Sequence, residues 1–288
     1  MNNTSKAGDR PVQRVNSLNA EVDCLLREGQ FAAVVERWFE LGLGMAPDLV
    51  LAPGVESELV DQAPGGGGFS TQAYSAAAWE DRIRGLEKRP MGLSLSLKVP
   101  QGVEGAGRRF GVSMNDEFNA TPGWVSLTVD ETVADVGEFV PGTGARWREF
   151  LVAALDSVPV AFGRVATDGN VGLQTSLDAA LNRNVIVSML QSSQYLRGYS
   201  WITVCPAALA ERLGGAVALV ASGAWARVVE LSSGDMVLQA TEEPAEFDDA
   251  ALRRVWAALA SVLPPGTPEK VLGSEYYQVI LEDAATVE

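Results

Sequence analysis

The stretch YSWITVCPAALAERLGG, from Tyr199 to Gly215, contains the change from strand to helix that decides the fold of the C-terminal part of the chain. Residues of strand type are followed by Pro206, which favours the first turn of a helix, and Gly214 with Gly215 is typical of a helix end. The periodicity of apolar residues and the positions of turn residues also predict the elements that follow in the sequence. They predict two strands, a helix and a final strand in ARVVEL (226–231), MVLQAT (236–241), DDAALRRVWAALASVL (248–263) and YYQVILE (276–282). The resulting order, β-α-β-β-α-β, is that of a ferredoxin-like unit.

A second α+β unit is predicted upstream. MGLSLSLKV (91–99) alternates apolar and polar residues with the period of two that is typical of a half-buried strand. RRFGVSMND (108–116), GWVSLTVDE (123–131) and VAFGRVAT (160–167) are read as further strands, and ARWREFLVAALDSV (145–158) as an amphipathic helix that covers them. Further helices are predicted in residues 18–26, 31–39, 71–90 and 173–193, the last in one or two pieces.

These elements predict an α+β protein of antiparallel sheets with covering helices, whose C-terminal half is ferredoxin-like. The alternative of two related α/β units packed together stays open. The glycine-rich stretch APGGGGFS (63–70) is interpreted as a connector. The predicted division is therefore a helical extension with a linker (1–68), a first α+β unit (69–172), and a connecting helix with the ferredoxin-like unit (173–288).

Charge and composition exclude several classes of function. The chain has 288 residues, a formal net charge of -15 and no histidine. Such a charge disfavours binding to nucleic acid or to anionic membrane surfaces. No stretch has the length of a membrane span and the N-terminal residues do not resemble a signal peptide, so we expect a cytoplasmic protein. The oligomeric state is left open.

The sequence contains few candidate residues for catalysis or for metal binding. Cys205 precedes a predicted helix, where a thiol can be activated, but without histidine it has no evident base, and a buried structural cysteine is favoured. Two cysteines cannot form a structural zinc site. Asp130, Glu131, Asp135 and Glu138 could offer oxygen ligands to a divalent cation, but a solvated acidic loop is favoured. We therefore predict no catalytic residue, no metal and no cofactor.

Aromatic residues gather around one arginine near the start of the C-terminal unit. Tyr195, Arg197, Tyr199 and Trp225 are of the types enriched in interface hot spots, and they are the predicted partner-binding residues. The alternative is that the aromatic side chains fill the core and that Arg197 bridges carboxylates.

The segments YLRGYSWITVCPAALAERLGG (195–215) and LSSGDMVLQATEEPAEFDD (231–249) resemble the C-terminal part of the type VI immunity family of bacterial proteins. The shared pattern is an R-G-x-x-W strand, a helix that ends in L-G-G, and a strand with glycine and an apolar run. The resemblance implies a cytoplasmic antidote that binds and blocks a cognate toxin without catalysis. A basic toxin would suit the acidic charge. The alternative from the residues is an enzyme that uses carboxylates, arginines or a bound cofactor in a pocket between the two α+β units.

Overall fold

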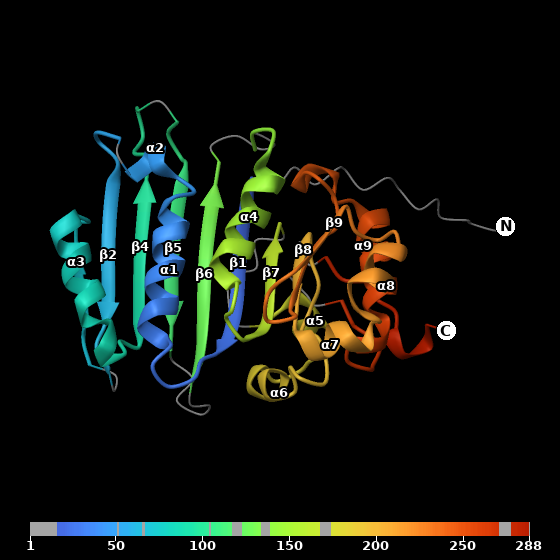
Figure 1. Cartoon of the computed structure of the whole chain (residues 1–288). Coiled ribbons are helices and arrows are strands. Elements are labelled where there is room, and N and C mark those ends of the chain that lie inside the picture. Colours follow the sequence, from blue (N-terminus) through green and yellow to red (C-terminus); the bar gives the residue numbers. More distant parts are fainter. Residues whose placement is uncertain are drawn as a thin grey trace.

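A computed structural model of the chain describes residues 16–50, 52–64, 67–103, 105–116, 123–133, 139–167, 174–270 and 278–287. Within these ranges the chain forms one β-sheet with helices packed on it, which confirms the predicted α+β class. The strands form one sheet with the order β3-β2-β4-β5-β6-β1-β7-β8-β10-β9, in which every neighbouring pair is antiparallel (Figure 1). The strands are β1 (Ser17–Leu25), β2 (Glu56–Gln62), β3 (Phe69–Gln72), β4 (Gly92–Lys98), β5 (Arg109–Asn115), β6 (Trp124–Thr132), β7 (Val160–Ala166), β8 (Ile202–Cys205), β9 (Arg227–Glu230) and β10 (Met236–Gln239).

Helices pack on this sheet: α1 and α4 lie over one of its faces, and α9 lies beside its C-terminal strands (Figure 1). They are α1 (Phe31–Leu43), α2 (Pro47–Val50), α3 (Ala76–Gly85), α4 (Thr143–Leu155), α5 (Ser176–Ala180), α6 (Val185–Leu190), α7 (Ala207–Arg212), α8 (Gly215–Ala221) and α9 (Asp249–Leu259). Short 3-10 turns occur at Leu86–Lys88, Pro244–Glu246, Ala260–Val262 and Ala284–Thr286. None of the helices in the described ranges is long and apolar enough to cross a bilayer.

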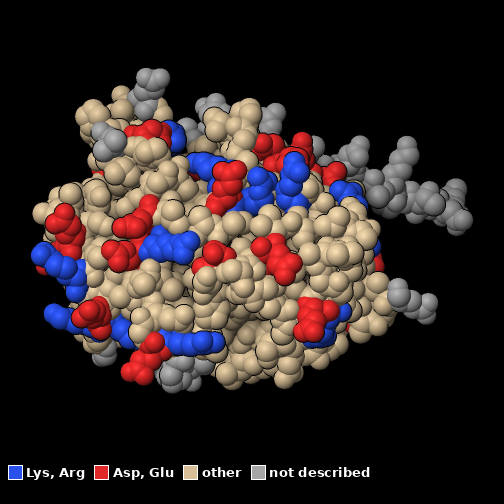
Figure 2. Space-filling view, in the orientation of Figure 1, with Lys and Arg blue, Asp and Glu red and all other residues tan. Residues whose placement is uncertain are grey.

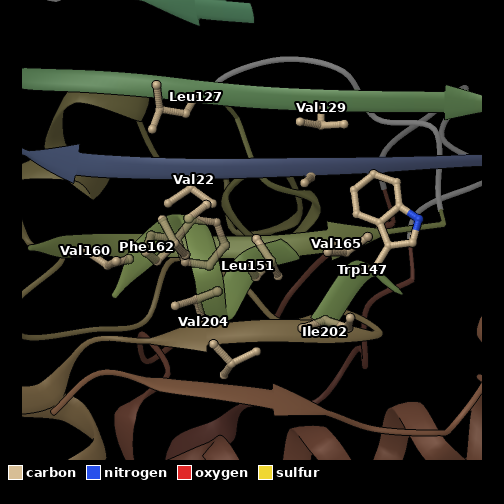
Figure 3. Close-up of a cluster of buried hydrophobic side chains, with 14 of the residues drawn as sticks. Val22, Leu127, Val129, Trp147, Leu151, Val160, Phe162, Val165, Ile202 and Val204 are labelled. Atoms are coloured by element: carbon tan, nitrogen blue, oxygen red, sulfur yellow. The ribbon is translucent and has the colours of Figure 1, made fainter. Parts of the chain in front are cut away.

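The main core lies between the sheet and helices α1 and α4. Trp38 of α1 is buried, contacts Phe150 of α4 at a ring-centroid distance of 4.9 Å, and donates from Nε1 to the Thr128 carbonyl at 3.1 Å. Gly42 lets α1 approach β5, because a Cβ there would lie 3.0 Å from Val112. Around Val22 of β1, apolar side chains of α4 and of β6 to β8 fill the interior (Figure 3).

The prediction of a helix at residues 18–26 is wrong, because these residues form the central strand β1. Leu18, Ala20, Val22 and Cys24 are all buried with a period of two. The intervening Asn19, Glu21 and Asp23 are also buried. The polar residues of this strand therefore do not mark a solvent-exposed face. The helix predicted next to it is confirmed as α1.

The fourth strand of the ferredoxin-like unit is not found where it was predicted. Strands β8, β9 and β10 have the order β8-β10-β9, with α7, α8 and α9 between or after them. The place beside β8 that a last strand would take is occupied by β7. Of the predicted strand 276–282, residues 276 and 277 lie outside the described residues, and 278–282 are not in a strand.

The sheet also runs through all three predicted segments of the chain. The predicted boundary at 68/69 falls in the connection between β2 and β3, which pair with each other from Leu59 with Gln72 to Gln62 with Phe69. Strand β1, from the first segment, lies between β6 and β7 of the second. Phe69 and Ser70, at the end of the glycine-rich stretch, therefore belong to a β-strand that pairs with β2.

Candidate functional site

Strand β1 has an unusual polar side on the sheet face opposite to α1 and α4. Glu21 and Asp23 point to this face, and both are at most 3% exposed. A buried carboxylate is costly unless a cation and hydrogen bonds compensate it. The structure supplies both, from parts of the chain far away in sequence.

Asp23 is held by Arg197, which was predicted to bind a partner. The guanidinium of Arg197 donates from Nη1 to Asp23 Oδ2 and lies 3.4 Å, through Nη2, from Asp178 Oδ2 of α5. Ser126 Oγ of β6 donates to the other oxygen of Asp23 at 2.5 Å. The Arg197 guanidinium also lies over the ring of Phe162, at 5.5 Å from the ring centroid. Arg197 thus connects the central strand to the segment that follows β7.

Asp178 extends this network to α6. Its Oδ1 accepts hydrogen bonds from Ser188 Oγ at 2.6 Å and from Arg183 Nη1 at 3.1 Å. Thr175 caps α5 by accepting from the Asp178 backbone N–H at 3.0 Å, and its hydroxyl donates to the Arg197 carbonyl at 2.6 Å. The caps and the ion pairs together hold residues 175–197 against β1.

A second pair lies two residues along the strand. Arg164 of β7 donates from Nε and Nη2 to Glu21 Oε2, at 3.2 and 3.1 Å. Glu21 Oε1 is buried and finds no hydrogen-bond partner within the part of the chain that the structure describes. Burial raises the pKa of Glu21 to about 7, and the nearby Arg164 opposes this shift. Burial likewise raises the pKa of Asp23, opposed by Arg197. We define Glu21, Asp23, Arg164, Asp178 and Arg197 as the buried charge network.

The buried charge network joins distant elements, and its geometry does not suit catalysis. Arg197, Asp23, Arg164, Asp178 and Glu21 are between 0% and 3% exposed in their side chains. A substrate could reach them only if the covering segment moved. Their pairing supports the alternative interpretation of Arg197, that it bridges carboxylates.

The four predicted partner-binding residues do not form one exposed patch. Tyr199 is 6% and Trp225 is 9% exposed, and both belong to the hydrophobic core. The Tyr199 hydroxyl accepts from the Ile280 backbone N–H at 2.9 Å, and burial raises the pKa of this phenol. Tyr195 is partly exposed. The prediction used strand periodicity from Tyr199 onward, whereas β8 begins at Ile202. The core alternative therefore accounts for Tyr199 and Trp225, and the role of the set in binding stays a prediction.

Both cysteines are free and buried. Burial raises the pKa of Cys205 to about 12 and also raises that of Cys24, so the thiolate form is disfavoured at neutral pH. Pro206 is the N-cap of α7, one position before the predicted one, and Gly214 adopts a left-handed φ of 87° just after the helix. These features agree with a structural role for Cys205.

The acidic segment that was weighed as a cation site is only partly described. Asp135 and Glu138 lie outside the described residues. Glu131 accepts from Arg146 Nη2 at 2.5 Å, and burial raises the pKa of Asp130. Among the residues that the structure describes, no group of three or more histidine, cysteine or acidic residues could hold a metal ion.

A cavity of about 410 Å³ lies next to Glu131. Its charged lining consists of two pairs, Arg108 with Asp48 at 2.7 Å and Arg146 with Glu131. Arg146 also donates from Nη1 to the Met45 carbonyl at 2.8 Å. The cavity therefore brings together both signs of charge, each already neutralised by its partner.

Away from the buried charge network, the same sheet face is exposed over β2, β3 and β4. We call this the open face and define it by Glu58, Val60, Phe69, Thr71, Ser94 and Ser96, all of which are partly or fully exposed. Phe69 is 72% exposed and, with Val60 and Ser94, lines a shallow hollow of about 220 Å³. Figure 2 shows the helix-covered side, where basic side chains lie beside acidic ones.

Sequence reasoning missed most of the buried charge network. Glu21, Asp23, Arg164 and Asp178 were not singled out from the sequence. They fell in segments predicted as a helix (18–26), a strand (160–167) and a helix (173–193). The alternation of apolar and polar residues in 18–24 was a usable signal of a strand. In a strand that is covered on both faces, the charged residues need oppositely charged partners.

No protein-family model matches the sequence, and no curated protein matches it. Among solved structures the fold is similar to one described as "Pseudomonas aeruginosa T6SS protein PA0821", with a TM-score of 0.58 and 12% sequence identity. The similarity covers 98% of this chain and 83% of that chain. The likeness therefore extends over nearly the whole chain, and at this identity it concerns the fold.

Proposed function

We propose that this chain is a non-enzymatic protein-binding protein of the cytoplasm, most concretely an immunity protein that neutralises a cognate bacterial toxin by binding it. The observation that carries the proposal is the similarity of fold, over 98% of the chain, to a T6SS protein. The abbreviation denotes the type VI secretion system. The resemblance of residues 195–249 to the type VI immunity family points in the same direction, from sequence alone.

The character of the described residues supports binding over chemistry. The most strongly buried charges are paired with each other, and both thiols are buried with raised pKa values. A net charge of -15 favours a basic partner through long-range attraction. The partner in this proposal is a protein and not a nucleic acid or a membrane.

Toxin protection tests this proposal. Each protein encoded beside this chain in its genome is expressed in a heterologous bacterium, with and without the chain, growth is measured, and a protein that arrests growth is taken as the toxin. We expect the chain to restore growth, and the purified pair to form a complex whose association slows as salt is added, because salt screens charges over about 8 Å at physiological ionic strength. Catalytically inactive toxin controls for the burden of expression. Failure of the chain to restore growth or bind that toxin would contradict the proposal.

A second candidate function is an enzyme or small-molecule binder at the cavity beside Glu131. The observation in its favour is that Arg108 and Arg146 line one cavity together with Asp48 and Glu131. This candidate predicts that Arg146→Gln abolishes the biological effect in a folded protein. Retained toxin protection by Arg146→Gln would exclude it.

A further inference from the structure

The two edges of the sheet differ in how they are protected. Edge strands present unpaired backbone groups, and proteins usually guard them with charges, proline or a covering element. At one edge, β9 begins with Arg227 and ends with Glu230, and α8 contacts it. At the other edge, β3 has the sequence FSTQ, with no charge and no proline, and all four residues are exposed.

Strand β3 pairs with β2 on its inner side. The pairs run from Leu59 with Gln72 to Gln62 with Phe69, and β3 is the first strand in the sheet order. Helix α3 supports it from the covered side, where Arg82 donates to Ser70 Oγ at 3.0 Å and lies 2.6 Å from Asp61. The edge is therefore fixed in position while its outer backbone groups point away from the sheet.

Phe69 adds an apolar anchor to this edge. It is 72% exposed and borders the shallow hollow of about 220 Å³ on the open face. Aromatic residues beside a hollow are typical of interface hot spots. Since opposite residues in antiparallel strands share a face, a strand that paired with β3 would place one side chain against Phe69 and another near Thr71.

We propose that β3 is the docking strand for the partner, which adds an extended segment to this edge as a further strand of the sheet. This proposal rests on the proposed function, because it takes the occupant to be a segment of the toxin. Strand addition uses main-chain hydrogen bonds for affinity and alternate side chains for specificity.

Charge decides between the possible occupants. A second copy of this chain would bring together two molecules with a net charge of -15 each, which disfavours self-association. The exposed carboxylate of Glu58, on the neighbouring strand and on the same face as Phe69, adds negative charge beside the hollow. The occupant is therefore a segment that carries basic residues and one apolar side chain that covers Phe69.

Hydrogen exchange of the full chain, alone and with the toxin that passes the protection assay, tests this directly. In the complex we expect backbone amides of β3 to exchange at least about tenfold more slowly, while those of β9, the matched edge, change little. A bound complex in which β3 exchange is unchanged would overturn the docking strand and leave the proposed function intact. Protection of β3 that rises with the concentration of the chain alone would instead identify a second copy as the occupant and overturn the toxin segment.

Substitution gives an independent readout. Phe69→Lys should weaken toxin binding at least about tenfold, because it removes the apolar anchor and repels a basic segment. Val217→Lys is the matched control, since Val217 is 84% exposed on α8 at the other side of the molecule. It should change affinity by less than about twofold, and both variants should melt like the wild type. Equal affinities of the two variants would refute the role of Phe69, whereas a wild-type chain that binds no toxin would overturn the proposed function together with this surface.

Discussion

One face of the sheet has two halves of opposite character. Over β1 and β7 it carries Glu21, Asp23 and Arg164, all buried, while over β2, β3 and β4 it carries Val60, Phe69 and Ser96 with partial or full exposure. The difference follows from what lies on top. Residues 175–197 cover the first half and bring Arg197 and Asp178 to neutralise its charges.

This comparison shows that a charged residue in a strand does not by itself indicate that this face of the strand is exposed to solvent. The covered half uses ion pairs to fix a distant segment of the chain, and the loss of one partner would leave its mate uncompensated. The open half has short hydroxyl side chains and one exposed aromatic residue, so single changes there should alter stability little. We expect the first half to determine stability and the second to determine binding.

The largest expected effect is the loss of Arg197. Arg197→Met leaves Asp23 and Asp178 buried without this cation, so the free energy of unfolding should fall by about 3–5 kcal/mol. Urea denaturation followed by circular dichroism measures it. A loss below about 1 kcal/mol would mean that the two halves do not differ in the way proposed.

The pH dependence of stability gives the next effect. The folded pKa of Glu21 is raised to about 7 from an ordinary value of 4.5, so the folded state holds this proton while the unfolded state has released it. Its contribution to stability is therefore present below pH 4.5 and is lost as the pH rises to about 7. The glutamine variant lacks this pH dependence. The unfolding free energy of Glu21→Gln minus that of the wild type should therefore increase by roughly 3 kcal/mol between pH 4.5 and about pH 7.

Urea denaturation of both proteins at a series of pH values measures this difference. A difference that stays constant between pH 4.5 and 7.5 would show that Glu21 is ionised throughout this range, held by Arg164.

Cys205 ends β8, the strand next to β7 of the covered half, and tests the packing there. Cys205→Ser places a hydroxyl where a fully buried thiol packs, and we expect a loss of about 1–2 kcal/mol of unfolding free energy with toxin protection intact. Thermal melts and the growth assay measure the two quantities. If the folded variant lost protection, the structural interpretation of Cys205 would be wrong.

The smallest effect is expected on the open half. Lys98 lies on the same face as Ser96, is 47% exposed in its side chain, and is 3.7 Å from Glu56. Lys98→Met removes a cation just as Arg197→Met does, but it should change the unfolding free energy by no more than about 0.5 kcal/mol. A cost similar to that of Arg197→Met would abolish the distinction between the halves.

Much of the fold could be predicted from periodicity. Strand β4 and helix α4 have clean patterns of two and of three to four residues, because each has one wet side, and both were predicted close to their observed bounds. Strand β1 was missed because both of its sides are buried, so its polar residues do not mark a surface. The last predicted strand was wrong at 278–282 because β7, which is distant in sequence, takes its place beside β8.

The candidate site could be predicted less well. Arg197 was singled out for its aromatic neighbours, but its partner Asp23 is 174 residues away along the chain, and no local pattern connects them. Phe69 was hidden in a segment interpreted as a linker, since glycine-rich composition predicts a turn equally well inside a hairpin. Spacing along the chain does not show which residues the sheet brings together.

The most direct test of the central claim compares the toxin affinity of two folded variants side by side. Arg197→Lys keeps the buried charge but loses the guanidinium geometry, whereas Phe69→Lys alters only the open edge. We predict a lower melting temperature with nearly unchanged affinity for Arg197→Lys, and an unchanged melting temperature with at least about tenfold weaker binding for Phe69→Lys. Weaker binding by Arg197→Lys, with wild-type affinity retained by Phe69→Lys, would contradict this account and return the partner site to the aromatic cluster around Arg197.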